Sequence, residues 1–234
     1  MKALCFTFDR NMPVMEYVLY TYFKHWPDNS FVFYIPWNNI KPDHLIDQYG
    51  ADKIKLLKTD SAVKPTIRTL LSVVNENEFI WWAQDDKYIL DFKNKQIIKD
   101  LHQHDAPEIG GFMLTKNADA ETAHTNITQN IGGYELIQKK NHHQIFQPQW
   151  IKKEIIESLY LNPALEEHYP LVNLYPLMAK TPIKNLYTTS DNYINIAESL
   201  DCGKITKNLA EHMKQDGFNI PNLLKCDKAI VYAD

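Results

Sequence analysis

Two adjacent carboxylates at the end of an apolar run are the residues in this sequence best suited to chemistry. Residues 79–84 read Phe-Ile-Trp-Trp-Ala-Gln, and Asp85 and Asp86 follow directly. An uncharged run of this length, bounded by charge, is typical of a strand buried on both faces. Ligands of open α/β sheets bind beyond the carboxyl ends of such strands, and paired carboxylates there suit a hard divalent cation and phosphate. The pair could instead open a turn or cap a helix.

The bulk composition is that of an ordinary globular domain. The chain has 234 residues, 44% hydrophobic and 23% charged, which is enough for a sizeable core and excludes a disordered chain. The 25 basic and 29 acidic residues give a net charge of −4, so nucleic acid is not an expected partner, because its backbone requires a basic face. Aromatic residues make up 12%, with five Trp, which predicts either a bulky core or a carbohydrate-stacking surface.

The cysteines and the N-terminus indicate a cytoplasmic protein. Cys5, Cys202 and Cys226 are odd in number and far apart, so neither a disulfide framework nor a zinc site is expected, and a reducing compartment is. The apolar stretch before Asp9 is too short for a signal peptide, and no run approaches the roughly 20 apolar residues of a membrane span. We therefore expect a cytoplasmic chain without a transmembrane segment.

The first half of the chain alternates between strand and helix patterns. Alternating elements of this kind predict an α/β fold with a doubly wound, mostly parallel sheet. The predicted strands are residues 3–9, 31–37, 53–58, 79–84 and 108–114, and the predicted helices are residues 11–26, 42–49, 65–75 and 93–103.

The second half is less regular. Residues 115–133 are polar and end in two glycines, which predicts a mobile loop, as a lid or part of an acceptor site. No repeat or linker divides the chain, so we expect one domain, residues 1–234, with an irregular C-terminal extension. The other predictions are a hairpin of strands 134–138 and 144–147, a helix at 148–160, an irregular stretch at 163–182 and a helix at 206–215.

These features together resemble the GT-A type of nucleotide-sugar glycosyltransferase, in particular its small bacterial and viral members. The alternating first half and the strand ending in Gln84-Asp85-Asp86 carry the resemblance, with the Gln147-Pro148-Gln149-Trp150 segment and the acidic pair Glu166-Glu167, to about residue 170. It implies a GT-A-like, Rossmann-related sheet, in which residues 1–114 bind the nucleotide sugar and residues 115–234 face the acceptor. The usual motif is Asp-any-Asp, and here Gln84 replaces its first carboxylate.

The resemblance implies transfer of a sugar from a UDP- or GDP-linked donor to a glycan or polysaccharide acceptor, assisted by Mn²⁺ or Mg²⁺. Asp86 holds the position of the metal ligand, and Asp85 would face the ribose or bind the metal through water. Lys64 and Arg68 precede the central strand and could reach the pyrophosphate, because a guanidinium or ammonium pairs well with phosphate. The alternatives are a solvated loop for Lys64 and an ion pair for Arg68.

The nucleoside is expected across the ends of the first and third strands. Thr7, Asp9 and Arg10 end the first strand, and Asp60 ends the third. Asp60 resembles the residue of the family that contacts the nucleoside, although aspartate is also common in turns. Asp9 could instead cap the helix that follows it.

An inverting transferase also needs a general base for the acceptor hydroxyl. In similar enzymes the carboxylate follows the helix that the Gln-Pro-Trp segment opens, which points to Glu167, with Glu166 beside it. His168 could orient this pair or a substrate, and Asp191 is a second candidate. The acidic pair could also be a solvated turn, and a retaining enzyme would need none of these residues as a base.

Two other functions fit the pattern less well or remain open. A sugar nucleotidyltransferase would have a glycine-rich phosphate loop after its first strand, and residues 9–13 contain no glycine. A noncatalytic nucleotide- or sugar-binding domain stays possible because Gln84 replaces a carboxylate.

Overall fold

A nine-stranded mixed sheet forms the centre of the molecule, which a computed structural model describes for residues 1–104, 108–115, 124–142, 145–180, 185–201, 203–223, 225 and 231–232. The strands are β1 (Lys2–Phe6), β2 (Val32–Trp37), β3 (Ile54–Lys58), β4 (Phe79–Gln84), β6 (Gly111–Met113), β7 (His124–Ile131), β8 (Tyr134–Lys139), β9 (Gln149–Lys152) and β10 (Leu186–Thr189). Their order is β3-β2-β1-β4-β9-β6-β10-β8-β7. Strands β1 to β4 are parallel, as predicted.

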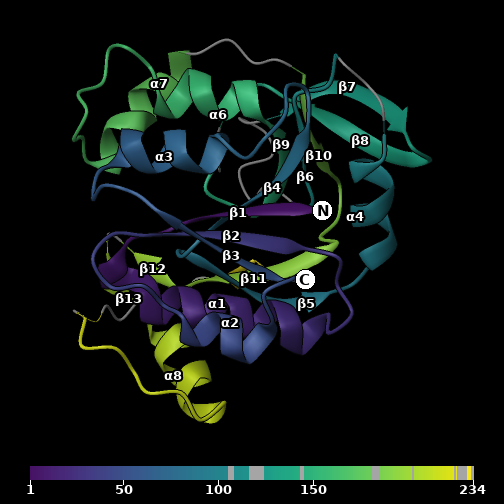
Figure 1. The fold of residues 1–234 in the computed structure, drawn as a ribbon. Coiled ribbons are helices and arrows are strands. Elements are labelled where there is room, and N and C mark those ends of the chain that lie inside the picture. Colours follow the sequence, from purple (N-terminus) through teal and green to yellow (C-terminus); the bar gives the residue numbers. More distant parts are fainter. Residues whose placement is uncertain are drawn as a thin grey trace.

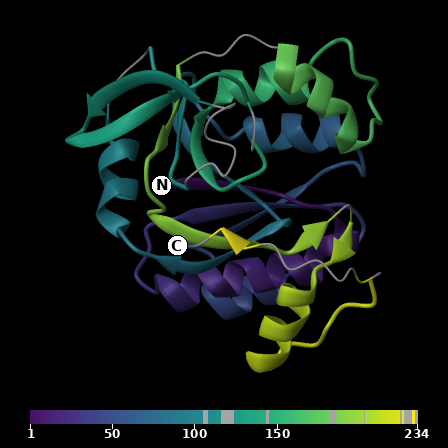
Figure 2. The ribbon, with the colours of Figure 1, turned by 180° about the vertical axis from the view of Figure 1, so that it is seen from behind.

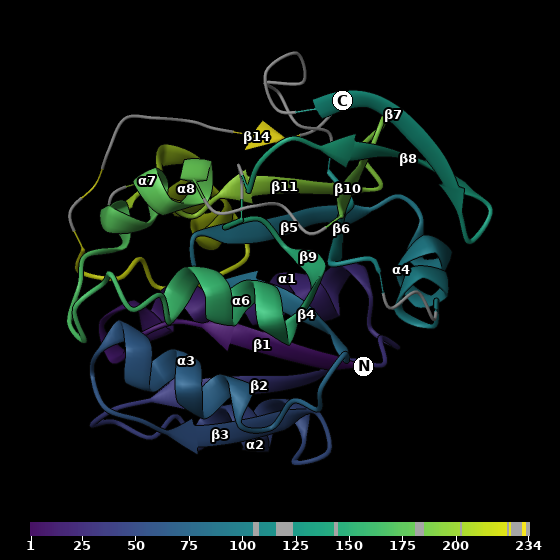
Figure 3. The ribbon, with the colours of Figure 1, turned by 90° about the horizontal axis from the view of Figure 1, so that it is seen from above.

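Helices cover both faces of this sheet (Figure 1). On one side lie α3 (Val63–Leu71), α6 (Lys153–Tyr160) and α7 (Leu174–Lys180), and on the other α1 (Met12–His25), α2 (His44–Tyr49) and α8 (Lys207–Gln215). Helices α3 and α6 lie side by side, as the view from above shows (Figure 3). This arrangement confirms the predicted α/β class and most of the predicted helices.

The alternation of side chains along β1 and β4 explains why both strands are apolar except at Lys2, which starts β1, and Gln84, which ends β4. Ala3 and Trp81 belong to the apolar cluster beneath the sheet, whereas Leu4 and Trp82 belong to the cluster against α3 and α6. Successive residues of a strand point to opposite faces, so a strand covered on both sides carries apolar side chains at nearly every position. Trp81, Trp82 and Trp150 are fully buried, so these tryptophans form the core and not a carbohydrate-stacking surface.

The prediction for residues 115–133 was wrong over its second half. Residues 124–131 form β7, which pairs with β8 through a turn at Gly132 and Gly133, while residues 116–123 lie outside the described part of the chain. Both glycines have positive φ, 62° and 87°, a conformation that favours glycine and suits a tight hairpin. The predicted pairing of residues 134–138 with 144–147 was therefore also wrong, because β8 pairs with β7 and β10.

The helix predicted at residues 148–160 begins later than expected. Residues 149–152 form β9, which inserts antiparallel between β4 and β6, and α6 follows it. Trp150 and Ile151 point into opposite apolar clusters, as they must in a strand. The irregular stretch predicted at 163–182 contains a 3-10 turn, η2 (Leu171–Asn173), and α7, and residues 181–184 lie outside the described chain.

A smaller three-stranded sheet lies against α1 and was not predicted. Its strands are β5 (Lys87–Phe92), β11 (Ile194–Glu198) and β14 (Val231–Tyr232), in the order β14-β11-β5 (Figure 2). The Asp85-Asp86 turn therefore joins β4 to a strand of a different sheet. The remaining elements are η1 (Asp9–Asn11), α4 (Lys95–His102), β12 (Leu200–Asp201) and β13 (Lys204–Ile205). No helix in the described segments has the length and hydrophobicity needed to cross a bilayer.

Candidate functional site

The parallel strands bring four of the chain's polar turns to one edge of the sheet. Thr7, Asn38, Thr59 and Asp85 each follow one of the strands β1 to β4, and we refer to the edge they define as the carboxyl edge. Thr7 Oγ1 donates to Asp85 Oδ2 at 2.7 Å, and Asn38 Nδ2 donates to the carbonyl of Thr59 at 3.3 Å. This is the edge at which open α/β sheets bind ligands.

A cleft of about 780 Å³ opens beside this edge, between the end of β3, helix α3 and the loop that follows α6. Three residues that were predicted from the sequence to bind the donor or to catalyse transfer meet here: Asp60, Arg68 and Glu167. Its complete lining is Lys58, Thr59, Asp60, Pro65, Arg68, Thr69, Glu167 and His168. The cleft therefore combines cations with two carboxylates.

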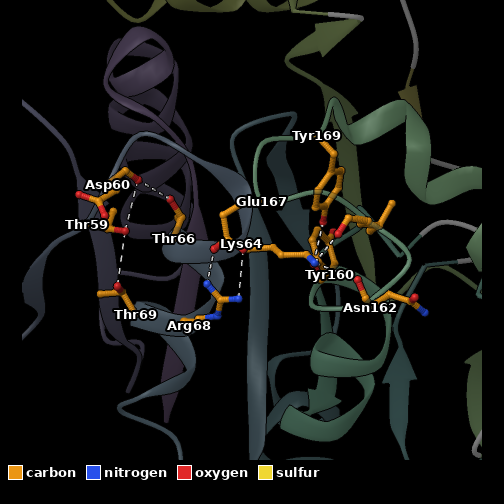
Figure 4. A network of polar contacts seen from close by, with 11 residues as sticks. Thr59, Asp60, Lys64, Thr66, Arg68, Thr69, Tyr160, Asn162, Glu167 and Tyr169 are labelled. Carbon is orange, nitrogen blue, oxygen red and sulfur yellow. Dashed lines mark hydrogen bonds and ion pairs between the residues drawn. The ribbon is translucent and has the colours of Figure 1, made fainter.

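Arg68 and Glu167 form a two-point ion pair across this cleft (Figure 4). Arg68 Nη1 contacts Glu167 Oε1, and Nη2 donates to Oε2 at 3.3 Å. The hydrogen bond from Arg68 lowers the pKa of Glu167. Both side chains remain about half exposed, at 55% and 43%. The fork of the guanidinium, which also matches phosphate geometry, is thus turned toward solvent and held by one carboxylate.

Lys64 is buried and is bonded to the loop after α6, which forms one wall of the cleft. Helix α3 begins at Val63, so Lys64 lies in its first turn and not in a solvated loop. Its ammonium donates to the carbonyls of Asn162 and Leu165 at 3.0 and 2.6 Å, as Figure 4 shows for Asn162. These bonds fix the loop that carries Glu167, so in this structure the charge of Lys64 orders the loop and is turned away from the cleft.

Asp9 ties the segment after β2 to the segment after β1. Its carboxylate accepts hydrogen bonds from the backbone N–H groups of Asn38, Asn39 and Ile40 at 2.7, 2.6 and 3.0 Å. Burial raises the pKa of Asp9, but these three donors outweigh it and the net pKa is lowered. Asp9 thus caps this loop and not helix α1. Arg10, its neighbour in η1, is exposed at the same edge.

Asp85 is a buried acid of the carboxyl edge. Burial raises its pKa to about 7, and the charge of Asp86 adds to this effect, while hydrogen bonds from Thr7 and Asn11 oppose it. Its contact with Thr7 joins the ends of β1 and β4. Asn11 directly precedes α1, but its side chain makes no capping bond and donates a hydrogen bond to Asp85 instead.

Gln84 and Asp86 are both committed to contacts inside the protein. Gln84, buried, donates through Nε2 to the hydroxyl of Tyr160 at 2.9 Å. Asp86 Oδ2 accepts from the ammonium of Lys87 at 2.9 Å, and Lys87 also lies 3.6 Å from Glu198 Oε1. Burial lowers the pKa of Lys87, but the two carboxylates outweigh it and raise it.

These contacts do not fit the predicted divalent cation at Asp86. Oδ1 of Asp86 is enclosed and has no hydrogen-bond partner among the residues that the structure describes, while Oδ2 already faces an ammonium. Gln84 points to Tyr160, and Asp85 to Thr7. Within the described segments, no group of three or more His, Cys, Asp or Glu side chains is arranged to hold a metal ion.

Lys58, Lys87 and Glu198 are among the residues of the site that the sequence did not single out. Lys58 ends β3 and lines the cleft, and its position at the end of a predicted strand could have indicated it. Lys87 follows the acidic pair directly, but its partner Glu198 lies on β11, a pairing without a local signal. Glu166 and Asp191, the other candidate bases, are exposed on the loops that follow α6 and β10.

The Gln84–Tyr160 contact yields a stability prediction. Tyr160→Phe removes the acceptor of a buried amide donor, which should lower the free energy of unfolding by about 1–3 kcal/mol. Urea unfolding followed by circular dichroism measures this. Tyr34→Phe is the matched control, because the hydroxyl of Tyr34 has no hydrogen bond to any described residue. Equal stability of the Tyr160 variant and the wild type would show that the contact contributes nothing.

Comparison with known proteins supports the fold. No protein-family model and no curated protein matches the sequence. The structure is similar to residues 1–349 of the S. aureus glycosyltransferase TarS, with a TM-score of 0.50 and 13% identity over 82% of this chain and 58% of that chain. It also matches the galactosyltransferase LgtC, crystallised with donor and acceptor sugar analogs, with a TM-score of 0.42 and 8% identity over 99% of this chain and 86% of that one. This chain thus spans 58% of the TarS chain. It has the GT-A-type, Rossmann-like fold.

Proposed function

We propose that this chain transfers a sugar from a nucleotide-diphosphate donor to a hydroxyl group of a glycan acceptor. The observation that carries the proposal is the cleft at the carboxyl ends of the parallel strands, where Arg68 and Lys58 face solvent beside Asp60 and Glu167. A guanidinium fork with a second cation near it suits a diphosphate. The GT-A-type fold, shared with a glycosyltransferase, supports the same assignment.

The donor lies along the carboxyl edge in this proposal. Asp60 and the backbone around Thr59 contact the nucleoside, and Arg68 binds the diphosphate, with Arg10 exposed at the far end of the edge. Thr7, Asp9 and Asp85 shape the floor, because each is bonded to a neighbouring strand end. The donor is of the UDP or GDP type, and the enzyme acts in the cytoplasm on a polysaccharide or related glycan.

The reaction is a single displacement. The acceptor oxygen forms a bond to the anomeric carbon as the bond from that carbon to the diphosphate oxygen breaks, and the diphosphate leaves with the electron pair. The acceptor proton passes to a carboxylate base, and the configuration at the anomeric carbon inverts. Positive charge beside the departing diphosphate lowers the barrier, and Arg68 and Lys58 are the cations that line this cleft.

Glu167 is the proposed base, with Glu166 as its neighbour. In the empty cleft Arg68 lowers the pKa of Glu167, which weakens it as a base. A diphosphate on Arg68 would compete with Glu167 for the guanidinium, release the carboxylate and return its pKa toward the ordinary range. Donor binding would thereby prepare the base.

Glu167→Gln tests this role. Transfer should fall by about 100-fold or more, since a general base contributes roughly 10²–10⁴-fold, whereas nucleotide affinity should stay the same or rise as Arg68 loses a competing carboxylate. Turnover and calorimetric affinity are to be measured on the same preparation. Glu166→Gln is the matched control, with a smaller expected effect. Wild-type turnover in the Glu167 variant would exclude it as the base.

The proposed function itself is tested by binding. UDP, GDP and their common sugar conjugates are screened by thermal shift and calorimetry, with Mn²⁺, with Mg²⁺ and with EDTA. A specific ligand stabilises the native state by about 2.7 kcal/mol at a hundredfold excess over its dissociation constant. Binding of one nucleotide that is lost in Arg68→Ala would support the donor site and would identify the nucleobase of the donor. No binding under any condition would refute it.

A noncatalytic nucleotide- or sugar-binding domain is the second candidate. The commitment of Gln84, Asp85 and Asp86 to contacts inside the protein favours it, because a catalytic motif usually has free oxygens facing its ligand. Binding without sugar transfer or donor hydrolysis would select this alternative.

A further inference from the structure

The turn that follows β4 carries a buried ammonium beside the predicted metal ligand. Lys87 is only 5% exposed, and its ammonium lies 2.9 Å from Asp86 Oδ2 and 3.6 Å from Glu198 Oε1. A lysine ammonium is a compact cation with three donors, so it occupies the same kind of position between carboxylate oxygens as a metal ion does.

The smaller sheet fixes this ammonium in place. Lys87 is the first residue of β5 and stands directly opposite Glu198 of β11 in the antiparallel register. The backbone N–H of Ser199 also donates to the carbonyl of Asp86 at 2.7 Å, which anchors the turn to the end of β11. The position of Lys87 is therefore set by strand pairing as well as by charge.

Asp86 Oδ1, the oxygen that Lys87 does not contact, is also poorly placed to bind a metal that must reach the phosphate oxygens of a nucleotide. Oδ1 is enclosed by protein atoms and Asp86 does not line the cleft, so a cation bound to Oδ1 would lie apart from phosphate oxygens in the cleft. Mg²⁺ and Mn²⁺ sites of phosphate-binding enzymes need one or two carboxylates together with phosphate oxygens. The remaining motif residues face Tyr160 and Thr7.

We infer that the ammonium of Lys87 holds the position at Asp86 in which a divalent cation was expected, and that this chain binds its nucleotide donor without a divalent metal. The cations that meet the diphosphate are then Arg68 and Lys58 in the cleft. The statement about the donor rests on the proposed function. The position of the Lys87 ammonium at Asp86 is a property of the donor-free protein and does not depend on the proposed function.

The first experiment is a Mn²⁺ titration of the donor-free protein. Binding is monitored by calorimetry and by the loss of the free Mn²⁺ signal in electron paramagnetic resonance. The wild type should show no saturable site in the submillimolar range. Lys87→Ala should gain one, because Asp86 and Glu198 lose their shared cation. Lys87→Gln, which keeps a hydrogen-bond donor without the charge, is the second variant if Lys87→Ala does not fold, and it should gain the same site.

Lys24→Ala is the matched control, because Lys24, in the last turn of α1, pairs with Asp216 at 2.6 Å and with neither Asp86 nor Glu198, and its removal should create no Mn²⁺ site. Saturable Mn²⁺ binding to the wild type that Asp86→Asn abolishes would overturn the inference. A folded Lys87→Ala and a folded Lys87→Gln that both fail to bind Mn²⁺ would also overturn it.

The second experiment compares nucleotide affinity in EDTA and in Mn²⁺. The dissociation constant of the nucleotide that binds should differ by less than about twofold, which is well below the 1.4 kcal/mol of a tenfold change. A tenfold loss in EDTA would overturn the inference. If no nucleotide binds with or without metal, the proposed function fails, while the Mn²⁺ titrations still decide what holds Asp86.

Discussion

Replacing Arg68 with alanine should weaken nucleotide binding by about 10- to 100-fold, since a charge-assisted bond to phosphate contributes roughly 1.5–3 kcal/mol. Arg68 lines the cleft, and its guanidinium is half exposed and, among the residues that the structure describes, pairs with Glu167 alone. The loss should be greatest for diphosphates and small for the nucleoside alone, because the lost contact is with phosphate. Calorimetry with the diphosphate, the monophosphate and the nucleoside measures this gradient.

Two variants make the Arg68 result specific. Arg68→Lys keeps the charge but loses the two-point fork, so it should fall between the wild type and alanine. Lys153→Ala removes a cation of α6 that pairs with Glu76 at 2.7 Å away from the cleft, and it should leave affinity unchanged. Folding should survive in both, because exposed ion pairs contribute only about 0–1 kcal/mol. Equal affinity of the wild type and Arg68→Ala for the diphosphate would remove Arg68 from the donor site.

Replacing Trp81 with alanine should lower the free energy of unfolding by about 3–5 kcal/mol, the usual cost of truncating a buried tryptophan. Trp81 is fully buried, packs edge to face on Trp150 with ring centroids 5.1 Å apart, and also contacts Phe31. Its indole N–H donates to the hydroxyl of Tyr22 at 2.7 Å, so truncation also leaves a buried hydroxyl without its donor.

Thermal unfolding by calorimetry should show a midpoint lower by roughly 10 °C in Trp81→Ala, at about 2–4 °C per kcal/mol for a chain of this size. Trp81→Phe keeps an aromatic ring and loses mainly the bond to Tyr22, so its loss should be smaller. An unchanged midpoint in Trp81→Ala would mean that β4 does not anchor the core as its burial indicates.

The N-terminal half was predictable because its signals are local. Strands β1, β2 and β4 are mostly apolar, and polar turns bound them and β3, so composition and period alone located them. Parallel strands end at the same edge, which is why the sequence alone places Asp60 and Asp85 near one edge. Whether the tryptophans are core or a stacking surface stayed open in the sequence, and the structure buries Trp81, Trp82 and Trp150.

The second half was not predictable in the same way because its strands pair across long stretches of chain. Strand β9 was read as the start of a helix, since the pattern of Trp150 and Ile151 fits both periods over so few residues. Its insertion between β4 and β6, which decides the matter, has no local signal. Strand β5 likewise exists because β11 pairs with it.

By itself the sequence determined the α/β class, the carboxyl edge and the residue types that meet there. Only the tertiary structure decided which of those residues face the cleft and which face one another. Arg68 meets Glu167 across 99 residues of chain, and Gln84 meets Tyr160 across 76. Lys87 receives its second carboxylate from β11. A side chain's type and spacing fix the bonds it can make, but its partner is set by which strands and helices pack together, and that depends on contacts that no local pattern encodes.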